Sequence, residues 1–418
     1  MKDLPAKPTD AYRVLHTADW HLGKLLNDQS RNEEHERFLA WLLELADKAS
    51  VDAIIVAGDI FDSANPPQSA LSRYYNFVSA LNKQTACSLV VVAGNHDSAA
   101  LLEAPKQVLR ALNVHVKGVL EENPADRILL LPNPDNPRVA VALLPFLRDR
   151  DLRTAKPGET ADDIRAQVIE GIKRRYEETA GAAAGLKCPL LATGHLTVAG
   201  TRPSDSERDI HIGGLGAVGP EIFPAPMRYV ALGHLHRPQE ARGHAHIRYA
   251  GSPIALSFSE STDTKEVRLL DIAGENISQH SVPIPVFRRL AQVCTSRQNL
   301  REDLDRFEVG GGELRTWVEV IVEDAAPGDD LVELARAAAE GKDFDVLKVI
   351  RGGAAAPGGL AVGDMADDEA IGSLLDDPSL VFDHLLEAHD NINEEEKGLL
   401  RTAFAELRAM HQEDDTVP

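Results

Sequence analysis

The stretch "VVVAGNHDS" (Val90–Ser98) decides how the rest of the sequence is interpreted. Its first four residues are small or β-branched and apolar, which predicts a buried strand. The strand runs directly into Gly94 and then into Asn95, His96 and Asp97. Asn and Asp are common in turns, but the imidazole between them needs another explanation. That explanation depends on whether other strands of the chain end in the same way.

Strand and helix patterns alternate along the first third of the sequence. Apolar strand-like runs lie at 12–19, 53–59 and 87–97. Stretches with apolar residues at helical spacing lie at 31–49, 68–83 and 98–114. This alternation predicts the α/β fold class, with βαβ units and a largely parallel sheet covered on both faces. Later strands are expected at 138–146, 188–195, 228–236, 246–253 and 265–272, and a charged helix at 162–179.

Composition divides the chain into four predicted segments. The run "VPIPVFRRL" (Val282–Leu290), which holds two prolines, marks the end of the first domain, 1–284. A small α+β domain follows at 285–352, and a Gly/Ala-rich acidic linker at 353–377. The last segment, 378–418, has the pattern of two amphipathic helices.

Charge and cysteine content limit the classes of function. The formal net charge is −22, and residues 361–418 hold 16 Asp/Glu and 3 Lys/Arg, so they carry −13 and the remaining 360 residues carry −9. Such a chain is not expected to hold DNA tightly through its own phosphate contacts. Three separated cysteines without a CxxC pair, and an N-terminus without an apolar h-region, favour the cytoplasm. No apolar run is long enough for a membrane helix.

Metal-type ligands follow five of the predicted strands, and a glycine precedes four of the five clusters. The clusters are Asp19-Trp20-His21, Gly58-Asp59, Gly94-Asn95-His96-Asp97, Gly194-His195 and Gly233-His234-Leu235-His236. Ligands bind beyond the carboxyl ends of strands in open α/β sheets, so we expect these side chains to share one site. In extended backbone, residues i and i+2 point the same way, which predicts that each DxH or HxH pair converges.

The ligand types indicate the metal chemistry. Carboxylate, amide and imidazole without thiolate suit Mn, Fe or Zn. The set is too large for one ion, and a bridging carboxylate, most naturally Asp59, would hold two metals about 3.5–4 Å apart. Such a pair binds phosphate oxygens and activates a water for an in-line displacement. Each cluster alone is a weak signal, whereas five at strand ends indicate a metal-dependent phosphoesterase.

At these residues the chain resembles the calcineurin-like metallophosphoesterase superfamily, whose pattern is D-x-H, G-D, G-N-H-[DE], G-H and G-H-x-H. The match is closest to its SbcD family of nuclease subunits. The similar stretches are "LHTADWHLGK", "GDIFDSANPP", "AGNHDS", "GGLGAVGPEIFP" and "YVALGHLHRPQ". The resemblance implies a four-layer αββα sandwich at 1–284, a capping domain at 285–352 and a C-terminal helical docking segment.

The resemblance also implies roles for the strand-end residues. One Mn would be held by Asp19, His21, Asp59 and His236, and the other by Asp59, Asn95, His195 and His234. Mg, Fe or Zn are the alternative metals. His96 would face the scissile phosphate as the proton-transfer group, with Asp97 orienting it by a hydrogen bond.

Two further residues are expected beside the substrate. Asp62 stands where archaeal and eukaryotic relatives have histidine, so a second catalytic histidine is not transferred to it. Arg237 follows the GHLH cluster and either contacts phosphate or lies on the surface.

Other histidines and aromatics are expected to be structural. His16 is interpreted as a packing residue, and His244 and His246 as surface residues. Trp20 is expected to form a wall beside the metals, with stacking on a base as the alternative. His211 lies in a loop and is assigned no chemistry.

Two helical surfaces are expected to bind partners. In the family, helices equivalent to those around Tyr74–Phe77 and Leu101–Leu112 form a homodimer, whereas ordinary helix-on-sheet packing is the alternative. The C-terminal helices would dock on an SbcC-type coiled-coil ATPase or, alternatively, pack on themselves. The docking residues are Leu380, Phe382, Leu385, Leu386, Leu399, Leu400, Phe404 and Leu407.

The leading hypothesis is therefore a Mn-dependent nuclease that cuts double-stranded DNA ends and hairpins, with both exonuclease and endonuclease activity, in DNA repair, replication and recombination. The ATPase would belong to the partner, because this sequence has no GxxxxGK[ST] loop. Two alternatives remain: a stand-alone phosphomonoesterase or cyclic-nucleotide phosphodiesterase, and a non-catalytic scaffold on the same fold.

Overall fold

The structure is a computed structural model of the chain. It describes residues 4–154, 158–204, 206–207, 217–324 and 330–352, together with Lys397, Leu400 and Phe404. The chain divides after Gly352, and the fold described below is that of the first part. The predicted linker and most of the predicted docking helices lie outside the described residues. Leu400 and Phe404 are within them, and both are helical.

The first sheet contains the three strands predicted at the start of the chain. Its order is β14 (Asn276–Pro283), β13 (Glu266–Ala273), β1 (Tyr12–Thr17), β4 (Ala53–Ala57), β5 (Ser88–Val92) and β6 (Val114–Lys117). Strands β1, β4, β5 and β6 are parallel, and β13 joins β1 antiparallel. All residues of β1, β4 and β5 are buried, as expected from their continuous apolar runs.

The second sheet contains the later strands. Its order is β11 (Gln239–Ala241), β12 (His244–Tyr249), β10 (Met227–Gly233), β9 (Leu190–His195), β8 (Val139–Ala142) and β7 (Ile128–Leu131). Strands β12, β10, β9 and β8 are parallel to one another. Both sheets are mixed, because β13 and β14 in the first sheet and β11 and β7 in the second pair antiparallel to their neighbours. The largely parallel sheet predicted from the first third of the sequence corresponds to the first of the two.

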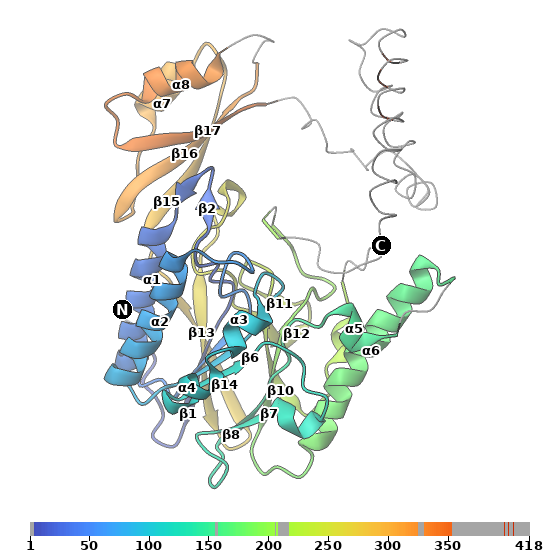
Figure 1. The fold of residues 1–418 in the computed structure, drawn as a ribbon. Coiled ribbons are helices and arrows are strands. Elements are labelled where there is room, and N and C mark those ends of the chain that lie inside the picture. Colours follow the sequence, from blue (N-terminus) through green and yellow to red (C-terminus); the bar gives the residue numbers. More distant parts are fainter. Residues whose placement is uncertain are drawn as a thin grey trace. The chain divides into compact units, whose positions relative to one another are not determined.

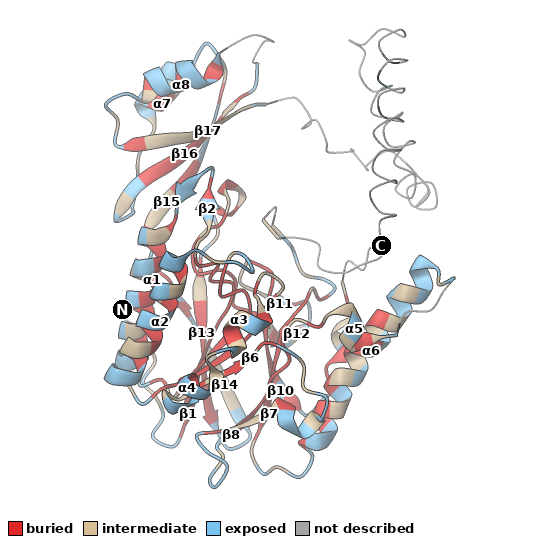
Figure 2. Ribbon diagram, viewed as in Figure 1, coloured by how far each residue is buried: buried red, intermediate tan, exposed pale blue. Residues whose placement is uncertain are grey.

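The two sheets pack face to face, with helices on the outer face of each (Figure 1). Alternate residues of β1 and β4 point inward, where Val14 and Ile55 share a core with Leu191 and Tyr229 of the second sheet. On the other face of the first sheet lie α1 (Asn32–Lys48) and α2 (Gln68–Gln84), and on that of the second lies α6 (Ala161–Ala182). The central strands β1, β4, β5, β8 and β9 are buried, and the helices are exposed on one side (Figure 2). This is the four-layer αββα arrangement.

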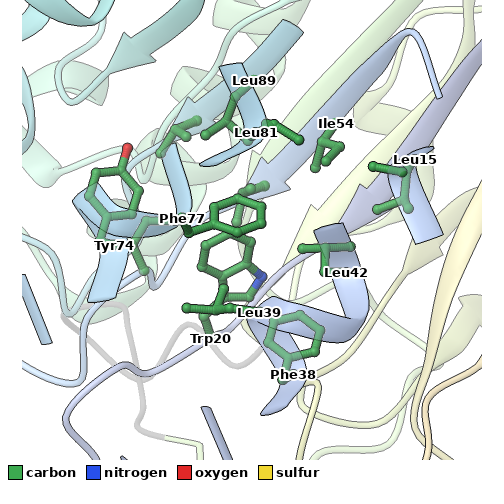
Figure 3. Close-up of a cluster of buried hydrophobic side chains, with 14 of the residues drawn as sticks. Leu15, Trp20, Phe38, Leu39, Leu42, Ile54, Tyr74, Phe77, Leu81 and Leu89 are labelled. Carbon is green, nitrogen blue, oxygen red and sulfur yellow. The ribbon is translucent and has the colours of Figure 1, made fainter. Parts of the chain in front are cut away.

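Trp20 lies in the core between the first sheet and its helices (Figure 3). It is fully buried, and its ring centroid lies 5.8 Å from that of Phe38 and 5.5 Å from that of Phe77, both edge to face. The indole Nε1 donates to the Thr17 hydroxyl at 3.1 Å. Trp20 therefore anchors α1 and α2 beneath the strand-end segment.

The helix predicted over 98–114 is two short helices. These are α3 (Ala99–Glu103) and α4 (Lys106–Ala111). Pro105 separates them because its ring removes an N–H donor and clashes with the preceding turn. A further short helix, α5 (Asp149–Leu152), follows the second sheet's strand β8.

The small α+β domain has a three-stranded parallel sheet of its own. Its strands are β15 (Arg288–Thr295), β16 (Leu314–Val322) and β17 (Phe344–Arg351), with helices α7 (Leu300–Arg306) and α8 (Leu331–Ala339) packed on them. Strand β15 begins inside the stretch predicted as a boundary. Trp317 of β16 contacts the sandwich, because its ring centroid lies 5.6 Å from the guanidinium group of Arg31. The guanidinium group of Arg288, from β15, lies 4.0 Å from the same centroid. A two-stranded ribbon, β2 (Leu25–Leu26) and β3 (Gln29–Ser30), lies beside α1.

Within the part of the chain that the structure describes, no helix is both long enough and apolar enough to span a membrane.

Candidate metal centre

All five predicted clusters meet at one edge of the sandwich. Three of the clusters follow β1, β4 and β5 of the first sheet. In the second sheet, one cluster forms the end of β9 and one follows β10. Three overlapping groups of side chains each place their ligand atoms within 4.8 Å of one another. The groups are Asp19 with His21 and His236, His21 with Asp59 and His96, and Asp19 with Asp59 and His195.

The backbone of four of the seven predicted ligands is left-handed rather than extended. Asp19, His21, Asp59 and His234 have φ of 52°, 45°, 51° and 94°. Non-glycine residues seldom adopt this region, and such strain collects at functional sites. The predicted convergence of the ligands is therefore found, but the i, i+2 alternation of an extended strand is the wrong reason for it.

Asp59 lies at the centre of the cluster and is 1% exposed. Its Oδ2 is 3.5 Å from His21 Nε2 and 3.3 Å from His195 Nε2, and its Oδ1 accepts the backbone N–H of His96 at 2.9 Å. A Cβ atom on Gly94 would stand 2.1 Å from the same Oδ1. Glycine is thus required here for the close approach of two strand ends, which brings one carboxylate between two histidines.

Main-chain carbonyls and Asp62 fix the histidine tautomers. A carbonyl oxygen only accepts, so His195 Nδ1 donates to the Ala57 carbonyl at 3.0 Å and His96 Nδ1 donates to the Asp62 carbonyl at 2.8 Å. The carboxylate of Asp62 lies 3.2 Å from His21 Nδ1. Each ring therefore presents Nε2 to the centre of the cluster, which is the arrangement of metal-binding histidines.

The donor atoms fit a cation. Asp19 Oδ2 and His21 Nε2 are buried and have no hydrogen-bond partner among the described residues, and burial raises the pKa of Asp19 to about 7. His195 Nε2 lies 2.9 Å from the amide oxygen of Asn95. Burial lowers the pKa of His195, but the neighbouring Asp59 carboxylate outweighs it and raises that pKa to about 9. Divalent cations bound at this cluster would replace the proton of His195 and satisfy the donor atoms of Asp19, His21, Asn95 and His195.

The sequence profile of the calcineurin-like phosphoesterase family matches residues 12–238. The SbcD subunit of the SbcCD nuclease of Escherichia coli strain K12 is 38% identical over 345 residues, which are 81% of this chain and 85% of that protein. The corresponding subunit from Rhodobacter capsulatus is 41% identical over 71% of this chain and 76% of its own length. The corresponding subunit from Bacillus subtilis strain 168 is 37% identical over 62% of this chain and 66% of its own length.

The chain belongs to the SbcD family of calcineurin-like phosphoesterases. It is therefore an enzyme, a metal-dependent phosphoester hydrolase whose relatives are nucleases.

Asp97 of this SbcD family member has a different contact from the one expected. Its carboxylate accepts the backbone N–H groups of Gly94, Ile60 and Phe61 at 2.9, 3.1 and 3.0 Å. These bonds tie the loop after β5 to the loop after β4. Nδ1 of His96 donates to the Asp62 carbonyl, and the three bonds of Asp97 hold the backbone of the loop that carries His96. Burial raises the pKa of Asp97 to about 6.

The two residues expected beside the substrate are already engaged. Asp62 forms an ion pair with Lys24 at 3.0 Å in addition to its bond with His21. Arg237 pairs with Asp263 at 3.0 Å and donates to the Ser259 carbonyl at 3.2 Å. The side chain of Asp62 is thus held beside His21, and that of Arg237 is held against the segment that contains Ser259 and Asp263.

The remaining histidines lie away from the cluster or outside the described residues. His16 is fully buried, and its ring bonds the Tyr229 hydroxyl at 3.0 Å and the Leu232 carbonyl at 3.2 Å, which joins the two sheets. His244 and His246 lie on β12, where neither is buried. His211 lies outside the described residues.

Four polar residues around His236 were not predicted. They are Ser206 at its ring, Glu207 at its backbone N–H, Lys265 at its main-chain carbonyl, and Glu260, which contacts both Ser206 and Lys265. They belong to segments with no strand-end motif, so only the fold brings them to the site.

Proposed function

We propose that the chain is a Mn-dependent DNA nuclease that hydrolyses phosphodiester bonds with two metal ions. The observation that carries the proposal is the convergence of buried carboxylate, amide and imidazole donors around Asp59. The nuclease relatives, matched over 81% of this chain, support nucleic acid as the substrate. Mn, with Mg, Fe or Zn as alternatives, suits the donor set.

Each proposed ion has ligands from both sheets. One would be held by Asp19, His21, Asp59 and His236, and the second by Asp59, Asn95, His195 and His234. When bound, the two ions supply charge for the phosphate oxygens and a nucleophile at neutral pH. The chain's own residues fix the positions of both ions, because the histidine tautomers and the ligand backbones are held by hydrogen bonds within the protein.

His96 is the proposed proton-transfer residue. Its Nδ1–H is held by the Asp62 carbonyl, so Nε2 carries the exchangeable proton. An imidazole has an ordinary pKa of about 6.5, which suits proton transfer to a leaving oxygen near neutral pH. Asp97 holds the loop on which His96 stands.

Substrate handling would require partners. We assign the C-terminal helices to an SbcC-type coiled-coil ATPase, which would supply ATP hydrolysis and positive surface for duplex ends and hairpins in DNA repair, replication and recombination. Helices α2 and α4 carry exposed Tyr75 and Val108, and we assign this face to a homodimer within a heterotetramer. The complex would act in the cytoplasm, at the nucleoid during DNA processing.

The test is a comparison of substrates with metal-stripped, full-length protein. End-labelled linear duplex, hairpin DNA and a small phosphomonoester are incubated with and without Mn²⁺, and with and without the SbcC-type partner. We expect Mn-dependent DNA cleavage, little monoester turnover, and no DNA cleavage by the Asp59→Asn variant. Fast monoester turnover with intact DNA would show a phosphatase instead, and inactivity under every condition would show a scaffold.

A further inference from the structure

The histidine ligands differ in the group that holds the far ring nitrogen. His195 uses a main-chain carbonyl and His21 uses a carboxylate. His236 Nδ1 instead lies 2.6 Å from the hydroxyl oxygen of Ser206. A hydroxyl both donates and accepts, so it defines the tautomer of His236 only if a further group fixes its own proton.

Glu260 is that further group. The Ser206 hydroxyl lies 2.5 Å from Glu260 Oε1, and a carboxylate accepts only. The hydroxyl therefore donates to Glu260 and presents its lone pair to His236. It follows that His236 carries its proton on Nδ1 and has a free lone pair on Nε2, on the side of Asp19 and His21.

Lys265 contacts both Glu260 and the backbone of His236. Glu260 has no exposed surface, and its Oε2 accepts Lys265 Nζ at 2.6 Å and the Leu256 N–H at 3.1 Å. The same Nζ donates to the main-chain carbonyl of His236 at 2.8 Å. The ion pair is thus bonded to both the ring, through Ser206, and the backbone of one histidine.

The burial of this ion pair indicates a role beyond stability. Removing two charges from water costs about as much as their attraction returns, so a buried pair such as Glu260–Lys265 is seldom a stabilising device. The groups that orient a metal-binding histidine, in contrast, often include a carboxylate.

We infer that Ser206 and Glu260, supported by Lys265, form a relay that fixes the tautomer and ring position of His236 for metal binding. The inference rests on the proposed two-metal centre. Glu260 and Ser206 are positioning residues, because they act through His236 and not on the substrate.

The experiment measures metal binding without DNA. Metal-stripped, full-length protein is titrated with Mn²⁺, and free Mn²⁺ is followed by electron paramagnetic resonance. We expect Ser206→Ala to weaken one of the two bound ions by about 10–100-fold, as loss of an orienting group does at other sites. Ser206→Thr, which keeps the hydroxyl, should restore the affinity. Because the residues act in series, Ser206→Ala combined with Glu260→Gln should weaken binding no more than the stronger single change.

Two measurements distinguish a positioning role of Ser206 from a role in folding. Ser206→Ala leaves the Glu260–Lys265 pair intact, so its loss of affinity should come without loss of thermal stability. The matched control is Glu319→Gln, because Glu319 is a buried glutamate that accepts Gln292 Nε2 at 2.7 Å and pairs with Lys348 at 2.8 Å, all within the small domain. It should leave both ions bound as in the wild type.

The outcomes distinguish the two proposals. Two Mn²⁺ bound equally tightly by wild type and Ser206→Ala would overturn the relay alone. A wild-type protein that binds fewer than two Mn²⁺ would overturn the two-metal centre, and the relay with it.

Discussion

Gly94 offers the sharpest test of how the strand ends build the site. The change Gly94→Ala places a Cβ atom 2.1 Å from Asp59 Oδ1 and 2.4 Å from the Asp59 backbone nitrogen. Ordinary contact begins at 3.4 Å, so the carboxylate oxygen must retreat by 1.3 Å. Rotation of the Asp59 side chain cannot relieve the second contact, because that atom belongs to the backbone. The loops after β4 and β5 therefore have to separate.

The expected cost has two parts. Overpacking of this kind destabilises a protein by about 1–3 kcal/mol, which lowers the midpoint of denaturant unfolding. A displacement of about 1 Å in catalytic groups reduces turnover by about 100-fold, and Asp59 is the shared ligand, so affinity for both ions should fall. The assays are urea unfolding, Mn²⁺ titration and nuclease activity on duplex DNA.

A matched control is Gly181→Ala. Gly181 lies in α6, and a Cβ atom there would have no heavy atom within 4 Å. Because alanine is the better helix former, this variant should be more stable by about 0.5–1 kcal/mol and equally active. If Gly94→Ala kept wild-type activity and metal affinity, the close packing of the two loops around Asp59 would not be what positions the carboxylate.

Other perturbations test separate parts of the argument. His96→Ala should lower turnover by about 10²–10⁴-fold with Mn²⁺ affinity unchanged by titration. Asp62→Ala should weaken Mn²⁺ binding by about 10–100-fold through loss of the bond to His21, whereas Asp62→Asn, which keeps an oxygen acceptor, should weaken it less. Burial lowers the pKa of His16 to about 3, so on acidification the unfolded chain binds a proton before the folded protein does. The free energy of unfolding should be at its full value above about pH 6.5 and about 2 kcal/mol lower at about pH 5. Urea unfolding of His16→Gln should show a smaller decrease over the same pH range. A chain ending at Gly352 should fold and cleave DNA weakly but fail to co-purify with the SbcC-type partner.

The sequence was sufficient to find the strand ends and their ligands because both are local properties. An apolar run such as that of β4 or β5 is visible without a partner strand, and the residues that follow it are simply the next letters. Convergence at one edge then follows from parallel strand direction. Asp59, Asn95 and His195 were found in this way, and the structure places them together.

The pairing of strands into two sheets is a long-range property that the same pattern does not contain. A strand covered by helices and a strand covered by another sheet are both buried on two faces, so β9 and β10 have the pattern expected of a central strand in either architecture. Only the resemblance to a known superfamily indicated the sandwich. Ser206 and Glu260 could not be predicted for a related reason. In the sequence they are ordinary polar loop residues, and only the folded structure shows that they lie beside His236.

The left-handed backbone of four of the ligands was not predicted. At these positions the chain adopts a conformation that favours glycine although the residue carries a ligand side chain. Two of these residues are held by main-chain hydrogen bonds: the N–H of Asp19 donates to the Gly58 carbonyl and that of His21 to the Asp59 carbonyl, both at 3.0 Å. Strain of this type costs about 1–3 kcal/mol per residue, and these bonds offset part of it by continuing the pairing of β1 with β4 past the strand ends. The ligand backbones are therefore fixed by the polypeptide itself, so the protein should bind its ions into a framework that is already formed.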